Sequence, residues 1–406
     1  MPIDTADTAF ILISAALVLI MTPALAFFYG GLVRRKNVLN TIMISFVTIA
    51  LVSIQWIFIG YSLAFSPDLG GFGFIGGLDW LGLNNVDLTP HQIYGSTIPH
   101  QAFMVFQMMF AIITAALITG AFVGRMKFKT FIIFTLLWTT LVYDPIAHWV
   151  WGAGGFLGNL GVLDFAGGTV VHISSGVSAL VVALVIGKRK GLGVKSMKPH
   201  DIRLMVLGAG FLWFGWFGFN AGSALTSGAL ATSAFVVTHI AASAGALSWM
   251  VVSWIRQKKP SVVGIATGAI AGLVAITPAS GFVGPMAAVV IGFVVGIVSF
   301  FAIEFKNKMG FDDALDVWAV HGIGGIWGAL AVGLFAQSAI NGVNGLFFGN
   351  PYQLILQAFG IAVACVYAMT ITFVILKVLD WTMGLRVNEK DEEAGLDISQ
   401  HGERIP

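Results

Sequence analysis

Residues 164–176 read DFAGGTVVHISSG, and residues 313–325 read DALDVWAVHGIGG. Both stretches place an aspartate eight residues before a histidine and a glycine four residues after it, at an offset of 149 residues. The matching positions are Asp164, His172 and Gly176 in the first stretch and Asp313, His321 and Gly325 in the second. A pattern repeated over this distance indicates a duplicated structural unit.

The composition around these stretches is that of a membrane protein. The chain has 406 residues, of which 57% are hydrophobic and 10% are charged, and its mean hydropathy is +0.90. A soluble domain carries about 25% charged residues, so a polytopic membrane protein is the simplest class. The single cysteine, Cys365, lies in an apolar run; it excludes an internal disulfide and a cysteine metal cluster, and we expect it to be a packing residue.

Eleven apolar runs are long enough, or nearly so, to cross a bilayer. They cover about 8–32, 41–65, 101–124, 130–148, 164–187, 203–221, 229–255, 261–277, 282–303, 314–336 and 353–379. The flank before the first run holds Asp4 and Asp7 and no basic residue, which predicts a retained helix rather than a signal peptide. The run at 261–277 is short and rich in glycine.

The basic residues predict the topology. With the N-terminus outside and eleven spans, all 21 Lys and Arg fall in inner loops or at the C-terminal end, and the outer loops hold none. Positive residues mark the cytoplasmic side. We therefore expect an all-α, multi-pass protein of the cytoplasmic (inner) membrane, with its N-terminus outside and its C-terminus inside.

Each repeat contains an odd number of helices. The second repeat therefore starts from the opposite side of the membrane, and its orientation is inverted. We expect repeats at about 8–187 and 203–336, followed by a last helix at about 353–379. The transmembrane domain is predicted to cover 1–384, and 385–406 to form a polar cytoplasmic tail, either solvated or regulatory. Eight residues of helix rise about 12 Å, and the hydrocarbon core is about 30 Å thick. The two histidines should then lie near mid-membrane, where the inverted repeats meet.

Ionisable residues at that depth mark a pathway. Burial favours neutral imidazole rings, and a neutral pair donates one hydrogen bond and accepts another. Such a pair suits a small polar molecule such as ammonia better than a hydrated metal cation. The alternative is two unrelated histidines, each bonded to a backbone carbonyl. For His148 and His239, nearer to helix ends, we expect packing or interface roles.

Asp164 has two interpretations. It either caps the free N–H groups at the start of a helix or stabilises a cation that enters the outer mouth. Some of the 33 Phe and 12 Trp could bind such a cation through their π faces. A membrane metalloenzyme is a further alternative, but no buried helix offers a pair of His, Cys or Glu ligands at i, i+3 or i, i+4. We therefore predict no metal, no cofactor and no enzymatic activity.

At this point the sequence resembles the Amt/Mep/Rh ammonium transporters, and within them the prokaryotic Amt branch. The resemblance covers essentially the whole chain. It is carried by MTPALAFFYGG at 21–31 with KNVL at 36–39, DFAGG at 164–168 with His172, GWFGFNAGS at 215–223, and Asp316-Val317 with His321-Gly322. Ala24 replaces the glycine that is usual after this proline.

The resemblance implies a homotrimer with one pore per subunit. It implies that His172 and His321 are a pore pair, that Trp216 lines the pore, and that Phe110 and Phe219 form a gate. It implies an outer ammonium recruitment site of Phe106, Trp151 and Ser223, supported by Asp164. Ammonium would lose a proton near the gate, and ammonia would cross the apolar lumen, with electrogenic transport as the favoured hypothesis.

The tail also resembles the family, at Gly395-Leu396-Asp397 and His401-Gly402-Glu403. The resemblance implies control of the inner mouth by a cytosolic PII-type protein that responds to nitrogen status. Expected partners are thus ammonium or ammonia, with methylammonium as a further substrate, together with the lipid bilayer and no nucleic acid. An ammonium sensor and a Rh-like gas channel are the remaining alternatives; the short tail argues against the first and the aromatic set against the second.

Overall fold

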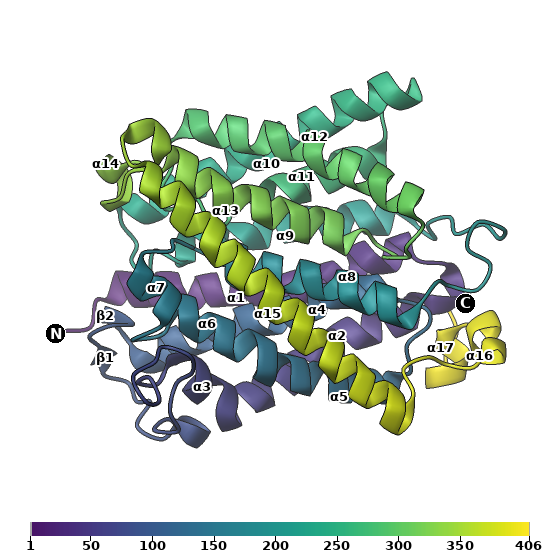
Figure 1. The fold of residues 1–406 in the computed structure, drawn as a ribbon, viewed down its shortest axis with the longest axis horizontal. Helices are drawn as coiled ribbons and strands as arrows, with labels where there is room; N and C mark the ends of the chain where they lie inside the picture. The colour runs from purple at the N-terminus through teal and green to yellow at the C-terminus, as the bar shows by residue number, and fades with distance from the viewer. Residues whose placement is uncertain (1, 406) are drawn as a thin grey trace.

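The computed structural model describes residues 2–405, and nearly all of its regular structure is helical. Apart from a two-stranded antiparallel hairpin, β1 (Pro90–His91) and β2 (Gly95–Pro99), the named elements of the described chain are helices. The prediction of an all-α fold is therefore confirmed. Figure 1 shows the long helices running side by side between the two ends of the molecule.

The first half of the chain contains helices that lead up to and through the first repeated stretch. They are α1 (Thr5–Leu32), η1 (Arg35–Asn37), α2 (Val38–Gln55), η2 (Trp56–Gly60), α3 (Tyr61–Phe65), η3 (Leu81–Leu83), α4 (His100–Phe122), α5 (Phe128–Trp138), η4 (Thr139–Tyr143), α6 (Asp144–Trp151), α7 (Phe156–Leu160), η5 (Gly168–Ile173) and α8 (Ser174–Ile186).

The second half contains the helices around the second repeated stretch and the tail. They are α9 (Ile202–Gly222), α10 (Ala229–Gln257), α11 (Val262–Ile276), α12 (Pro285–Met309), η6 (Trp318–Ile323), α13 (Gly324–Phe335), α14 (Ser338–Asn341), η7 (Leu346–Phe348), α15 (Pro351–Met383), α16 (Glu389–Ala394) and α17 (Leu396–His401).

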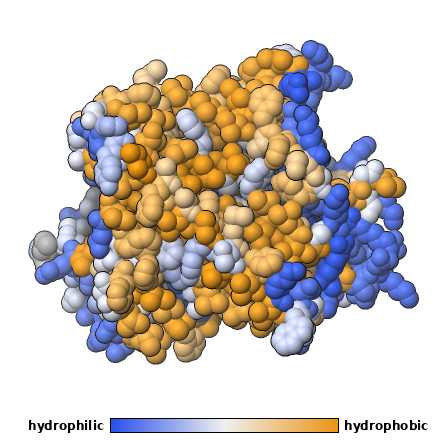
Figure 2. Space-filling view, in the orientation of Figure 1, coloured by the Kyte–Doolittle hydropathy of each residue, from blue (hydrophilic) through white to orange (hydrophobic). Residues whose placement is uncertain are grey.

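The predicted spans correspond to helices. Among the described residues, 10 helical stretches are long and apolar enough to cross a membrane, and the short glycine-rich run forms α11, which has 15 residues. Apolar side chains cover the flank of the molecule in Figure 2, and hydrophilic residues gather at its two ends. The termini lie at opposite ends, and α15 crosses the other helices diagonally (Figure 1).

The two halves pack through small residues. A Cβ atom added to Gly208 of α9 would lie 2.4 Å from the backbone N of Phe28 in α1, and one added to Gly31 would lie 2.5 Å from the carbonyl oxygen of Asp201. Glycine therefore lets the first helix of each half approach the other at backbone distance, as helices in lipid commonly do.

Four of the spans contain a π-helical turn. These turns are η2, η4, η5 and η6, and the two histidines of the repeated pattern lie in η5 and η6. A π turn holds one more residue than an α turn and often marks a functional site.

The tail is folded onto the end of the molecule at which α2 begins. The backbone N of Asn40 donates to Oδ1 of Asp397 at 2.8 Å, and the backbone N of Leu396 donates to Oδ1 of Asn37 at 2.9 Å. Asp397 is 2% exposed. The tail thus forms two short packed helices rather than a solvated end.

Candidate functional site

The structure brings the two repeated histidines together inside the bundle. Nδ1 of His321 lies 3.2 Å from Nδ1 of His172, and the two rings are 1% and 4% exposed for His172 and His321 respectively. At this distance one ring donates and the other accepts. Nε2 of His172 is buried and has no hydrogen-bond partner among the described protein atoms.

The repeated glycines explain why the two segments can cross so closely. A Cβ atom on Gly176 would lie 2.1 Å from the backbone N of Gly322, and one on Gly325 would lie 3.1 Å from Cβ of His172. Each glycine thus lies against the histidine segment of the other repeat. The contacts run in opposite order along the two segments, so the helices cross in the antiparallel sense that an inverted repeat predicts.

Asp164 binds the start of η5. Its Oδ1 accepts from the backbone N–H groups of Gly167 and Gly168 at 2.8 and 2.7 Å, and its Oδ2 accepts from those of Thr169 and Val170 at 2.7 and 3.1 Å. Burial raises the pKa of the Asp164 carboxyl, and these N–H groups partly offset the rise. Capping, one of the two interpretations of this residue, is therefore present in the structure.

Asp313 occupies the equivalent place in the other repeat with fewer partners. Its Oδ2 accepts from the backbone N of Trp318 at 2.7 Å, and its Oδ1 is buried without a partner. Burial and the nearby charge of Asp316 raise the pKa of Asp313 to about 6. Asp316 itself accepts a hydrogen bond from Lys306.

Two phenyl rings separate an outer cavity from an inner one. The ring centroids of Phe110 and Phe219 are 4.2 Å apart, and both side chains are buried. Phe110 lines the outer cavity and Phe219 lines the inner one. The pair therefore lies at the boundary between the two spaces.

The outer cavity has a volume of about 290 Å³ and is lined by Trp151 and Ser223. Nε1 of Trp151 donates to the carbonyl oxygen of Asp164 at 2.8 Å, and Oγ of Ser223 donates to the carbonyl oxygen of Phe219 at 2.9 Å. The indole N–H is thus already bound, which leaves the ring face for a ligand. Phe106 and Asp164, expected at the same site, are not among the residues that line this cavity. The ring of Phe106 packs edge-to-face on that of Phe110, with centroids 4.9 Å apart.

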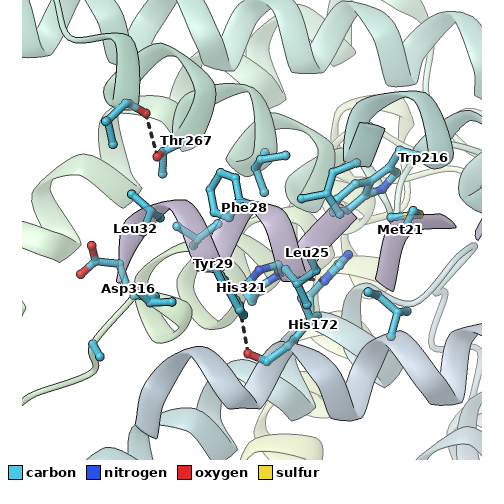
Figure 3. A pocket seen from close by; sticks show the side chains of 18 of the residues that line it. Met21, Leu25, Phe28, Tyr29, Leu32, His172, Trp216, Thr267, Asp316 and His321 are labelled. Atoms are coloured by element: carbon cyan, nitrogen blue, oxygen red, sulfur yellow. Dashed lines mark hydrogen bonds between the residues drawn. The ribbon is translucent and has the colours of Figure 1, made fainter. Parts of the chain in front are cut away.

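The inner cavity, of about 200 Å³, contains the histidine pair. Figure 3 shows His172 and His321 side by side in it, near Leu25 and Tyr29, with Trp216 further along. Trp216 lines the cavity as expected, and its ring is stacked on that of His172 with centroids 5.5 Å apart. Apart from the histidines and Asp316, most of the lining is apolar.

Sequence reasoning missed three polar residues at the site. Gln107 lines the outer cavity, and its Oε1 is buried without a partner. Tyr94 lines the same cavity from the hairpin. Thr277 accepts a hydrogen bond from Nε1 of Trp216 at 2.8 Å. A glutamine directly after Phe106 inside an apolar run was a visible signal, whereas Tyr94 and Thr277 reach the site only through tertiary structure.

The fold and the site define a class. A bundle of membrane-spanning helices encloses an apolar inner cavity with buried histidines, separated by paired rings from an outer aromatic cavity, as in a channel or transporter for a small polar solute. No group of three His, Cys, Asp or Glu able to hold a metal occurs within residues 2–405.

Comparison with known proteins gives the family. Residues 9–405 match the Ammonium Transporter Family, and the chain belongs to it. The chain is 52% identical over 401 residues to an ammonium transporter of Bacillus subtilis (strain 168), and the matched stretch covers 98% of each of the two chains. The resemblance found in the sequence is confirmed, and the protein is an ammonium transporter of the membrane rather than an enzyme.

Solved structures agree with this assignment. The crystal structure of Saccharomyces cerevisiae Mep2 superposes with a TM-score of 0.90 at 39% identity and covers 96% of this chain and 89% of that one. A structure described as a sensor Amt protein superposes with a TM-score of 0.90 at 30% identity and covers 98% of both chains.

Proposed function

We propose that this transporter captures the ammonium ion in the outer cavity, removes its proton beside the phenyl pair, and passes ammonia along the histidine pair. The observation that carries the proposal is the order of the parts. The outer aromatic cavity comes first, then the rings of Phe110 and Phe219, and then the buried histidines in an apolar cavity.

Capture rests on the groups that face the outer cavity. The Trp151 ring face attracts a monovalent cation, and the free lone pairs of Ser223 and Oε1 of Gln107 accept N–H bonds from it. Asp164 supports the site indirectly, because its carbonyl oxygen binds the Trp151 indole. Phe106 supports the site through its edge-to-face contact with the ring of Phe110.

Passage beyond the rings requires loss of the charge. Paired rings 4.2 Å apart leave no room for a hydration shell, and an ion in an apolar lumen is costly. Ammonia, in contrast, hydrogen-bonds to an imidazole nitrogen such as the unpartnered Nε2 of His172. Electrogenic transport follows if the proton crosses by a separate route, and the histidine pair is a candidate for part of it.

The test is the current after an ammonium jump on solid-supported membranes loaded with the purified protein. Wild type should give a saturable current that is absent in ammonium-free buffer. In His172→Ala we expect the current to fall by about tenfold or more, as for loss of a proton-transfer group, or to lose selectivity against potassium.

His239→Ala is a matched control, because His239 lies exposed on α10 outside both cavities. A His172→Ala current equal to that of wild type would remove the histidine pair from the mechanism. Ammonium uptake without charge movement would remove electrogenicity alone.

We also propose a topology with the N-terminus outside and the C-terminus in the cytoplasm, in the inner membrane, with 1–384 as the membrane domain and 385–406 as the tail. The support is the segregation of all 21 basic residues. Single cysteines at Ser96 and at Lys308, placed in a Cys365→Ser background, should react with an impermeant reagent from outside and from inside respectively. The reverse pattern would contradict the topology.

Assembly as a homotrimer and control by a PII-type protein are proposed from the family resemblance. The folded tail offers a surface for such control, since Glu389 and Lys190 form an ion pair of 2.6 Å that joins it to the loop after α8. Truncation before Asn388 should alter both PII binding and transport control. If both are unchanged, the tail has no regulatory role.

A sensor is the second candidate function, favoured by the likeness to the sensor Amt structure. Ammonium binding without any current in the same preparation would favour it over transport.

A further inference from the structure

His148 is a buried histidine that the proposed path does not use. It lies in α6, three residues before Trp151, and is 0% exposed. Its Nδ1 is 3.0 Å from the carbonyl oxygen of Ala64, and its Nε2 is 3.1 Å from Oδ1 of Asp68. A carbonyl and a carboxylate are both acceptors, so this geometry leads us to expect a ring that donates from both nitrogens. A ring that donates from both nitrogens carries a positive charge, so we expect the contact with Asp68 to be a buried ion pair.

Asp68 is suited to the negative role in this pair. Burial raises the pKa of its carboxyl, but the N–H of Gly73 and the His148 ring lower it by more, so that the pKa of Asp68 lies below its ordinary value of 3.8. The Asp68 side chain is 8% exposed. Removing one partner of such a pair leaves the other charge buried and uncompensated.

The glycines that follow Trp151 make room for this contact. A Cβ atom on Gly152 would lie 2.4 Å from Nδ1 of His148, and one on Gly154, whose φ is +92°, would lie 3.1 Å from Cβ of Asp68. The loop of residues 66–79, called the outer loop below, can therefore press against the turn of residues 152–156.

Further hydrogen bonds tie the same turn to the outer side. Nε1 of Trp149 donates to the carbonyl oxygen of Phe74 at 2.7 Å, and the backbone N of Phe156 donates to the carbonyl oxygen of Gly73 at 3.1 Å. The backbone N of Ala153 donates to Oη of Tyr94 at 2.6 Å. Trp151 lies among these tethered residues. The ion pair is the one contact among them that joins two opposite charges.

We infer that His148 and Asp68 are a positioning pair for ammonium capture: they hold the outer loop against the segment that carries Trp151 and so fix the indole face in the outer cavity. The inference rests on the proposed capture of ammonium at Trp151. Neither His148 nor Asp68 lines the outer cavity, so the pair acts through Trp151. Its loss should change the apparent affinity for ammonium while the maximal current is retained.

The test uses Asp68→Asn, which is nearly isosteric and removes the charge. We expect the half-saturating ammonium concentration of the current to rise by about tenfold, because a small displacement of a positioned group has effects of this order or more, with the maximal current within about twofold of wild type. Asp79→Asn is the matched control, since it removes the same charge from an exposed position of the outer loop and should leave the half-saturating concentration unchanged.

Nitrogen-15 NMR of the His148 ring gives a readout that does not depend on transport. Wild type at neutral pH should show both ring nitrogens protonated, and Asp68→Asn should show a neutral ring. In a double-mutant cycle, His148→Gln combined with Asp68→Asn should raise the half-saturating concentration no further than the single changes do.

The outcomes separate the two proposals. Absence of any ammonium current in wild type would overturn the proposed function. A normal wild-type current together with an unchanged half-saturating concentration in Asp68→Asn, additive effects in the cycle, or a neutral His148 ring in wild type would overturn the positioning pair alone. If Asp68→Asn fails to fold, the wild-type ring spectrum still decides.

Discussion

Asp164 and Asp313 occupy equivalent positions in the two repeats, yet their surroundings differ. Both oxygens of Asp164 accept hydrogen bonds, four in all, from the first turn of η5. Asp313 accepts from the backbone N of Trp318 through one oxygen, and its other oxygen is buried without a partner. The same pattern in the sequence therefore produces a closed cap at one end of the path and an incomplete one at the other.

The difference shows which residues of the repeated pattern the fold constrains in both copies. The histidines and the glycines lie where the two segments cross, so each copy constrains the other. The aspartates lie away from the crossing and are free to diverge. The outer one supports Trp151 through its carbonyl oxygen, while the inner one lies beside the charged pair of Lys306 and Asp316.

The largest effect that would sharpen this comparison comes from removing each carboxylate. Asp164→Ala leaves four buried N–H groups without an acceptor, at a cost on the order of 1 to 3 kcal/mol each. Asp313→Ala removes one accepted bond and one unpartnered oxygen. We expect Asp164→Ala to lower the melting temperature and the ammonium current far more than Asp313→Ala does. Equal losses for the two variants would contradict the difference in capping.

A second comparison uses the crossing glycines. In Gly176→Ala the new methyl group would meet the backbone of Gly322 at 2.1 Å, whereas in Gly325→Ala the nearest atoms lie at 3.1 Å. Backbone cannot give way as a side chain can, so we expect Gly176→Ala to cost at least about 3 kcal/mol, the upper end for overpacking. Gly325→Ala should cost less. The melting temperature in detergent measures both effects. A larger loss of stability in Gly325→Ala than in Gly176→Ala would contradict the closer backbone contact at Gly176.

The smallest effect is a dependence of stability on pH. Because the pKa of Asp313 is raised from 3.8 to about 6, the folded state holds this proton more tightly than the unfolded chain. Its contribution to stability is fully present below about pH 4 and is lost as the pH rises through about 6, by at most about 3 kcal/mol. Asp164, whose pKa is also raised, contributes with the same sign.

The difference between wild type and Asp313→Asn isolates the Asp313 contribution. Unfolding measured from pH 4 to pH 7 should show the wild type losing its advantage over the variant across this range. An advantage that stays constant or grows with pH would refute the raised pKa of Asp313.

Much of the architecture was readable from the sequence. Apolar runs of bilayer length predict helices because lipid leaves backbone groups no other partner, and the runs correspond to the helices found, including the short α11. The repeated spacing predicts that His172 and His321 lie at one depth and come from opposite directions, and the structure adds the contact between their rings.

Several contacts at the site could not be predicted from the sequence. Phe106, placed at the outer site by the family resemblance, packs edge-to-face on Phe110 and is not among the residues that line the outer cavity. The contact of Thr277 with Trp216 joins residues 61 positions apart. The His148–Asp68 pair depends on a glycine turn packing against a distant loop. Such contacts depend on tertiary geometry, which the pattern of residues along the chain does not reveal.

The π turns have a consequence for how this chain can change in length. Each of the turns η5 and η6 carries a surplus residue relative to an α-helix. Deleting one residue there would convert the turn to α geometry and change the direction in which the residues of the turn itself point. The imidazole would then point away from its counterpart. In an evolutionary comparison, these two turns should tolerate exchange of side chains but not gain or loss of a residue, whereas the outer loops should tolerate both.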